Sequence, residues 1–217
     1  MVPASNFDAA FNRFQELVTA KSGKPLSGFD EGMAAVWESY KPRLRKHALS
    51  ILAADSWSEA DIGTGRILDR TIEAVEIQDA GQNLINNLVF WQNRYGHANR
   101  DHRALIEAQS NPSVRNTVEQ ALFDHFRTER PDEESFEAIA DLTGRKYPLV
   151  AYLFFLRDPE SFMPIQPTGF DRAFQALGIE FSTLRQCNWE NYKTYNAVLQ
   201  VSESWGPRIM RLDGSIY

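Results

Sequence analysis

The sequence contains a single cysteine, Cys187, among its 217 residues. One cysteine excludes an intramolecular disulfide framework, and no Cys/His ligand set of the zinc-finger kind can be assembled. A chain of this length buries roughly 70% of its unfolded surface, so its core needs no cross-link. We therefore expect a protein that is stabilised by its hydrophobic core in a reducing, cytoplasmic setting.

Long apolar segments are also absent. The longest apolar stretch, residues 149–156, is far shorter than the roughly 20 residues of a membrane-spanning helix. The first ten residues include an acid, Asp8, and no apolar run, which is unlike a signal peptide. We therefore expect no membrane partner.

Motifs of several enzyme classes are missing. The sequence has no Gly-rich phosphate loop, no Gly-x-Ser-x-Gly elbow, no His-Glu-x-x-His and no EF-hand loop. These absences argue against nucleotide hydrolysis, α/β-hydrolase chemistry and zincin chemistry. His97 and His102 have the wrong spacing for two metal ligands on one helical face, so we expect them to be solvated or to face phosphates. The chemistry expected here requires no metal and no cofactor.

Helical periodicity is the strongest positive signal. Apolar residues in segment 7–18 follow the i, i+3, i+4, i+7 spacing of one buried stripe, which Ser5 and Asp8 open as a capping box. Thr168 and Asp171 form a second capping box. The predicted helices cover residues 7–18, 33–54 with a break at Pro42, 66–77, 112–122, 133–141, 147–156, 170–177 and 189–199.

Single residues mark several helix boundaries. Asn111 is an N-cap before Pro112 at the first helical position, and Gly178 ends a helix. Residues 147–156 are apolar on every side, which is typical of a buried helix or a buried strand; the Tyr-Pro start and the leucines favour a helix.

The predicted fold class is mainly α. No run of alternating strand residues with Asn-Gly or Asp-Gly turns is present, so a sheet-based architecture has little support. We expect one compact helical domain over residues 1–217, in which residues 1–110 and 111–217 could form two lobes around a cleft.

The most unusual segment is residues 82–97, which mixes amides, aromatics and an arginine with apolar residues. On a helix, Asn83, Asn87 and Arg94 would lie near one face, with Trp91 four residues after Asn87. A pocket that stacks a base on Trp91 or Tyr95 and reads its edge with Asn87 would need these residue types. The alternative is that the asparagines are caps and buried hydrogen-bond partners, and that Trp91 belongs to the core.

Charge is unevenly distributed. The net charge of −6 argues against coating nucleic acid through bulk charge. However, cations cluster in residues 41–46 and 94–103, and acids in residues 129–141. This segregation permits a phosphate-binding face, although a charge run is more often a solvated helix face. The predicted DNA-backbone contacts are Lys41, Arg43, Arg94, Arg100 and Lys146.

Asp158 is the candidate catalytic residue. It follows the apolar segment 147–156 and precedes Phe162 and Met163, so its pKa could be raised and it could act as an acid or base. Because Pro159 comes next, an ordinary helix stop also explains this aspartate.

Three segments carry a resemblance to a known class of proteins: Asn86-Asn87-Leu88-Val89 with Trp91 and Tyr95; Tyr147-Pro148-Leu149-Val150-Ala151-Tyr152 to Asp158-Pro159; and Phe162-Met163-Pro164-Ile165 before Phe170-Asp171. They resemble helical segments of bacterial defence proteins, some of which stand beside HNH nuclease modules. No His-Asn-His metal motif follows here, so the resemblance implies a DNA-handling part without the nuclease. By architecture and size alone, the chain also resembles the helical DNA glycosylases, some of which excise modified bases in antiviral defence.

The leading hypothesis is a DNA glycosylase that flips a modified base out of phage DNA and hydrolyses its glycosidic bond without a metal. Asp158 would be the catalytic carboxylate, and Asn87, Trp91 and Tyr95 would form the base pocket. Two alternatives stay open. One is a noncatalytic reader of modified DNA that recruits a nuclease. The other is a helical protein-interaction module whose acidic segment 129–141 contacts a basic partner.

Overall fold

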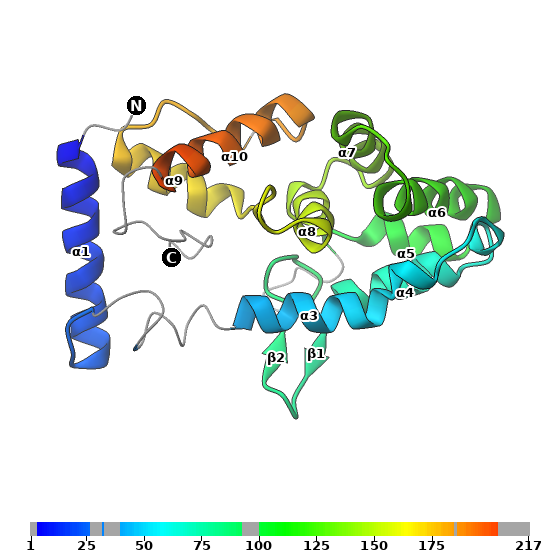
Figure 1. Cartoon of the computed structure of the whole chain (residues 1–217), viewed down its shortest axis with the longest axis horizontal. Coiled ribbons are helices and arrows are strands. Elements are labelled where there is room, and N and C mark those ends of the chain that lie inside the picture. The colour runs from blue at the N-terminus through cyan, green and yellow to red at the C-terminus, as the bar shows by residue number, and fades with distance from the viewer. Residues whose placement is uncertain (1–3, 27–31, 33–39, 93–99, 185, 204–217) are drawn as a thin grey trace.

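The computed structural model of the chain describes residues 4–26, 32, 40–92, 100–184 and 186–203, and this part is mainly helical (Figure 1). The predicted fold class is therefore confirmed. None of the described helices is long and apolar enough to cross a membrane. The described elements are α1 (Ala4–Ser22), α3 (Tyr40–Leu52), α4 (Arg66–Val75), β1 (Gln78–Asp79), β2 (Leu84–Ile85), α5 (Arg103–Gln109), α6 (Pro112–Arg127), α7 (Asp132–Leu142), α8 (Tyr147–Arg157), α9 (Pro167–Leu177) and α10 (Trp189–Glu203), with single 3-10 turns at Ala54–Ser56 and Glu59–Asp61.

Helix boundaries follow the sequence where one or two residues decide them. The side chain of Asn111 accepts a hydrogen bond from the Val114 amide at 3.3 Å, and Pro112 is the first residue of α6. At the end of α9, Gly178 has a φ of 71°, in the left-handed region that glycine enters without a steric penalty. These boundaries are as predicted.

Both capping boxes predicted above are wrong. α1 begins at Ala4, so Ser5 lies inside the helix and cannot be its N-cap. Asp171 does not turn back to the start of α9. Its carboxylate accepts hydrogen bonds from the amides of Thr183 at 2.6 Å and Leu184 at 3.0 Å, and so holds the loop after the helix. The capping pattern was present in the sequence, but a tertiary partner takes this carboxylate.

α8 is the central element of the core. All of residues 147–156 are buried, and the segment is a helix, as the sequence favoured. One continuous apolar cluster extends from Leu44 in α3 to Leu199 in α10 and contains α8. Aromatic rings pack beside α8: the Phe136 and Tyr192 rings stack at 5.2 Å between centroids. Because α8 has no polar face, it needs neighbours on every side (Figure 1).

Arg45 connects α3 to the end of α8. The last carbonyl groups of a helix have no partners inside the helix, and here they are shielded from water. The guanidinium of Arg45 donates to the carbonyls of Phe155 at 3.2 Å, Leu156 at 2.8 Å and Arg157 at 3.4 Å. Arg45 belongs to the basic cluster of residues 41–46, yet its role in the fold is structural.

Glu119 connects α6 to the start of α4. This side chain is fully buried, and its carboxylate accepts hydrogen bonds from the amides of Gly63 at 2.7 Å, Gly65 at 3.1 Å and Leu68 at 2.9 Å. A carboxylate at a helix N-terminus satisfies free N–H groups and complements the helix dipole. Glu119 therefore fixes the loop before α4 on α6.

A small hairpin corrects the prediction for residues 82–97. β1 and β2 pair antiparallel, with Gln78 opposite Ile85, and the pairing continues through the Asn86 amide, which donates to Ile77 at 3.0 Å. The helix expected to place Asn87 and Arg94 on one face is absent up to residue 92, where this described stretch ends. The hairpin lacks an Asn-Gly or Asp-Gly turn, which is why the sequence did not reveal it.

The first prediction concerns the contact between α3 and α8. Arg45→Ala should lower the free energy of unfolding by about 2 kcal/mol, because buried carbonyls lose a charged donor. Lys46→Ala, which removes the exposed neighbouring cation, should change it by less than about 0.5 kcal/mol. Urea denaturation followed by tryptophan fluorescence measures both values. Equal losses in the two variants would contradict the structural role of Arg45.

Candidate nucleic-acid interface

α3 is a basic helix whose cations point in different directions. It carries Lys41, Arg43, Arg45 and Lys46 and has no acidic residue. Lys41 is buried on the same side as Leu44, and Arg45 reaches α8. Arg43 and Lys46 are exposed and lie three residues apart, so they share one outward face. Only these two of the four cations on α3 are placed to contact a ligand in solvent.

Arg43 and Lys46 have no acidic partner in the described part of the chain. Arg43 donates one hydrogen bond, at 2.6 Å, to the carbonyl of Gln82 at the tip of the hairpin. A guanidinium has five N–H donors, so the others stay available. This bond also places the hairpin tip directly beside the exposed face of α3.

The hairpin presents amides outward. Burial alternates along β2 and the residues beside it: Leu84 and Asn86 are buried, whereas Asn83, in the turn, and Asn87 are exposed. This period of two is typical of a strand with one face on the core. Within the described residues, the side chains of Asn83 and Asn87 make no hydrogen bond. The backbone carbonyl of Asn87 accepts one from the Gln166 side chain at 3.3 Å.

Asn86 and Trp91 have structural roles. The Asn86 side chain donates to the Val75 carbonyl at 2.8 Å and accepts from the Leu88 amide at 3.0 Å. The Trp91 indole donates to the Asn86 carbonyl at 2.9 Å and packs against the core. Asn86 is therefore a buried hydrogen-bond partner and Trp91 packs with the core, as the alternative interpretation predicted. Tyr95 and Arg94 of the predicted site lie outside the described residues.

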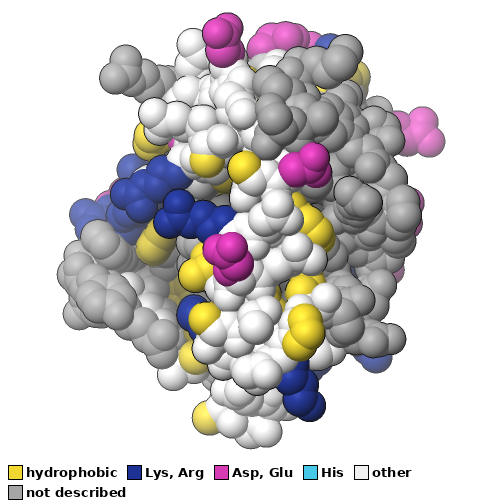
Figure 2. All heavy atoms as spheres, turned by 90° about the vertical axis from the view of Figure 1, so that its left-hand side faces the viewer, with side chains coloured by type: hydrophobic (Ala, Val, Ile, Leu, Met, Phe, Trp, Pro, Cys, Tyr) yellow, Lys and Arg dark blue, Asp and Glu magenta, His cyan; other side chains and the backbone are white. Residues whose placement is uncertain are grey.

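Arg100 and Lys146 are two further predicted DNA contacts among the described residues. Arg100 is exposed, lies over the Phe90 ring at 4.2 Å and donates to buried Asp101 at 3.1 Å. Lys146 is exposed but precedes α8, whereas α3 meets the other end of α8 through Arg45. Eleven helical residues separate these ends by about 16 Å. Figure 2 shows that, on the face turned to the viewer, Lys and Arg side chains gather on one flank.

Asp158 is the residue at which α8 ends. Its carboxylate accepts hydrogen bonds from the amides of Glu160 at 3.0 Å and Ser161 at 3.2 Å. Partial burial favours a higher pKa, but the hydrogen bonds from Ser161 and Glu160 and the charge of Arg157 outweigh it and lower the pKa of Asp158. The expected rise in pKa is therefore wrong. The catalytic role of Asp158 stays a prediction.

Two histidines are buried, which corrects the expectation that His102 is solvated or faces phosphates. His102 is fully buried, and its Nε2 donates to Glu76 at 2.6 Å. His125 donates from Nε2 to the Leu153 carbonyl at 3.3 Å and accepts from the Ser135 hydroxyl at 2.9 Å. Burial, aided by the charge of Arg157, lowers the pKa of His125 to about 3.

The acidic segment 129–141 is largely paired within the chain. Arg157 binds Asp132, and Arg145 binds Glu137 at 3.0 Å and Asp141 at 2.5 Å. These arginines neutralise acids that the protein-interaction hypothesis assigned to a basic partner. The structure thus gives that hypothesis little support.

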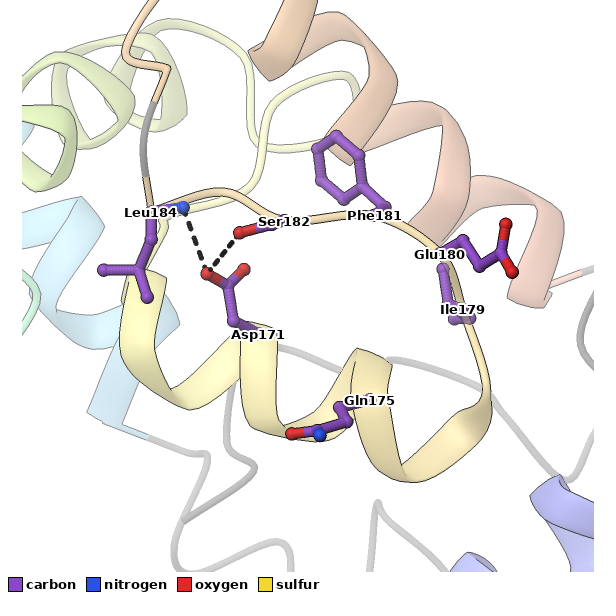
Figure 3. Close-up of a pocket in the computed structure, with 7 residues that line it drawn as sticks. All are labelled: Asp171, Gln175, Ile179, Glu180, Phe181, Ser182 and Leu184. Carbon is purple, nitrogen blue, oxygen red and sulfur yellow. Dashed lines mark hydrogen bonds between the residues drawn. The ribbon is translucent and has the colours of Figure 1, made fainter.

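A pocket beside α9 is lined by two carboxylates, Asp171 and the exposed Glu180 (Figure 3). The Asp171 carboxylate already accepts hydrogen bonds from the Ser182 hydroxyl and the Leu184 amide, both at 3.0 Å. The lining residues are Asp171, Gln175, Ile179, Glu180, Phe181, Ser182 and Leu184.

No family model, curated protein or solved structure matches the chain. Its function is therefore argued from the exposed face of α3 and from the hairpin.

The second prediction concerns His125. Its pKa is lower in the folded state than in the unfolded state, so the unfolded state binds more protons below about pH 6.5 and stability falls as the pH falls. Between pH 7.5 and pH 5, His125 should cost about 2 kcal/mol of stability. Denaturant unfolding of the protein and of His125→Gln at both pH values measures this. An unchanged pH dependence in the variant would contradict it.

The third prediction concerns Asp158. Asp158→Ala should lower the free energy of unfolding by about 1 kcal/mol, because two amides lose their acceptor. Asp158→Asn keeps an acceptor oxygen and should retain most of the stability. The asparagine variant therefore also tests catalysis in an assay for alkali-labile sites in modified phage DNA. If the native protein forms such sites and Asp158→Asn does not, the catalytic role is supported. Equal activity of the two proteins would contradict it.

Proposed function

We propose that the protein binds DNA through the exposed face of α3 and acts as a noncatalytic reader of modified DNA that recruits a nuclease. One observation carries the proposal: Arg43 and Lys46 are exposed on a helix without acids, and no carboxylate in the described chain pairs with either. Cations that are not neutralised within a protein are available to replace the counterions of phosphates.

The spacing of these cations suits a nucleic-acid backbone. Side chains three residues apart on a helix start about 5–6 Å from each other, so two long cationic side chains can contact neighbouring phosphates. A reader needs only this binding face. Base excision also needs a catalytic carboxylate, and one oxygen of Asp158, Oδ1, already accepts two amide hydrogen bonds in the turn after α8. DNA binding without catalysis therefore requires fewer functional groups than base excision.

The net charge of −6 is compatible with this surface. Three acids of α7, Asp132, Glu137 and Asp141, are paired with arginines, and α8 lies between α3 and α7 in Figure 1. Exposed charges that are separated by more than about 8–10 Å are largely screened at physiological salt. Local charge at α3, and not the total, therefore decides the interaction with a phosphate backbone.

The fourth prediction tests the α3 face. The double variant Arg43→Ala/Lys46→Ala should weaken duplex binding at least about tenfold and reduce the slope of log affinity against log salt by about 2. Fluorescence anisotropy with labelled phage DNA fragments between about 50 and 200 mM salt gives both values.

The control is Arg70→Ala/Lys193→Ala, which removes the same charge from exposed positions on α4 and α10. It should bind like the native protein. An equal loss in both double variants would contradict a specific role for α3. The same samples are treated with alkali, and protein-dependent strand breaks would overturn the noncatalytic proposal in favour of base excision.

A further inference from the structure

The hairpin carries more recognition chemistry than phosphate binding requires. Asn83 and Asn87 expose side-chain amides that no described group binds, and they lie just before and just after a segment that Leu84 and Asn86 fix in the core. A free amide offers one donor and one acceptor side by side. This pair matches the N6 and N7 groups on the major-groove edge of adenine.

The hairpin tip is already ordered before any ligand arrives. Asp79 accepts hydrogen bonds from the amide of Gln82 at 3.1 Å and from its side chain at 3.0 Å. Arg43 holds the Gln82 carbonyl from the side of α3. Asn83 has a φ of 49°, a left-handed conformation that asparagine tolerates better than most residues. A surface that is fixed in this way loses little conformational entropy on binding.

The shape and charge of this region suit a DNA groove. In Figure 1 the hairpin projects beyond α3, away from the helices. Two paired strands lie about 4.8 Å apart, and a ribbon of this kind enters the major groove, which is about 12 Å wide, more readily than the minor groove of about 6 Å. The hairpin contains one acid, Asp79, and its carboxylate is turned toward Gln82, from which it accepts two hydrogen bonds.

From this juxtaposition we infer that the β1–β2 hairpin enters the major groove of duplex DNA and that Asn83, assisted by Asn87, reads an adenine. Arg43 and Lys46 hold the flanking phosphates, and Arg43 also positions the hairpin through Gln82. The inference rests on the proposed DNA-binding function. It adds to that function a base-specific group and a nucleic-acid class, double-stranded DNA with an adenine in the bound site.

The fifth prediction tests this assignment with a random duplex library. The native protein should enrich duplexes that contain a fixed adenine, and it should bind a selected duplex about tenfold or more tightly than a scrambled one. Asn83→Gly removes the amide, and glycine accepts the left-handed conformation, so the hairpin is retained. This variant should lose the discrimination but keep the affinity for the scrambled duplex and the salt slope. Gln175→Ala, which removes an exposed amide from α9, is the control.

A change in the DNA completes the experiment. Replacing the fixed adenine with 7-deazaadenine removes the N7 acceptor and should weaken binding by the native protein but not by Asn83→Gly. Salt-dependent binding without sequence preference, or equal discrimination by both proteins, would overturn this inference and leave the proposed function standing. Absence of duplex binding at low salt would overturn both.

Discussion

The complete burial of α8 is the constraint on which the rest of the structure depends. A helix without a polar face must be covered on all sides, and the carbonyls at its end must find donors within the protein. Arg45 supplies these donors from α3. Arg157, the last residue of α8, lies over the rings of Phe154 and Phe162 at 4.9 and 5.4 Å and binds Asp132. Cationic side chains thus complete the end of the most apolar helix.

This requirement divides the cations into two groups. Arg45, Arg145 and Arg157 are engaged with carbonyls or carboxylates of the protein. Arg43 and Lys46 lie on the exposed face of α3, whereas Arg45 of the same helix reaches α8. Neither Arg43 nor Lys46 has an acidic partner among the described residues. The helix that fastens the core therefore also presents the charge on which the proposed DNA binding depends. Since α3 is fixed by its inner side, its outer cations are held in a defined place.

The hairpin, like α3, packs against the core on one side and presents the proposed binding groups on the other. Its inner residues, Leu84 and Asn86, are held by the core and by the Val75 carbonyl, so the outer asparagines stand on a fixed strand. The amides that were expected on one face of a helix lie in and beside the hairpin instead. The inward Asn86 satisfies backbone groups, and the outward Asn83 and Asn87 remain free for a ligand.

The sequence by itself determined most of the described helices, though not α5, because caps, turn residues and apolar periodicity act within a few residues. Asn111 and Gly178 mark boundaries, and residues 147–156 form the buried helix. His125 could also have been found, since it follows Val118, Ala121 and Leu122 on the buried stripe of α6.

Tertiary structure alone decided which partner each polar group takes. The Asp158 carboxylate accepts hydrogen bonds from the amides of a turn, and its pKa is lowered. The Asp171 carboxylate does not cap α9 as expected but accepts hydrogen bonds from amides twelve and thirteen residues later in the chain. The hairpin has no strong turn signal, and packing against α3 selects a strand where the composition suggested a helix. The physical reason is that a local pattern fixes backbone conformation, whereas hydrogen-bond partners and exposure depend on residues that are distant in the sequence.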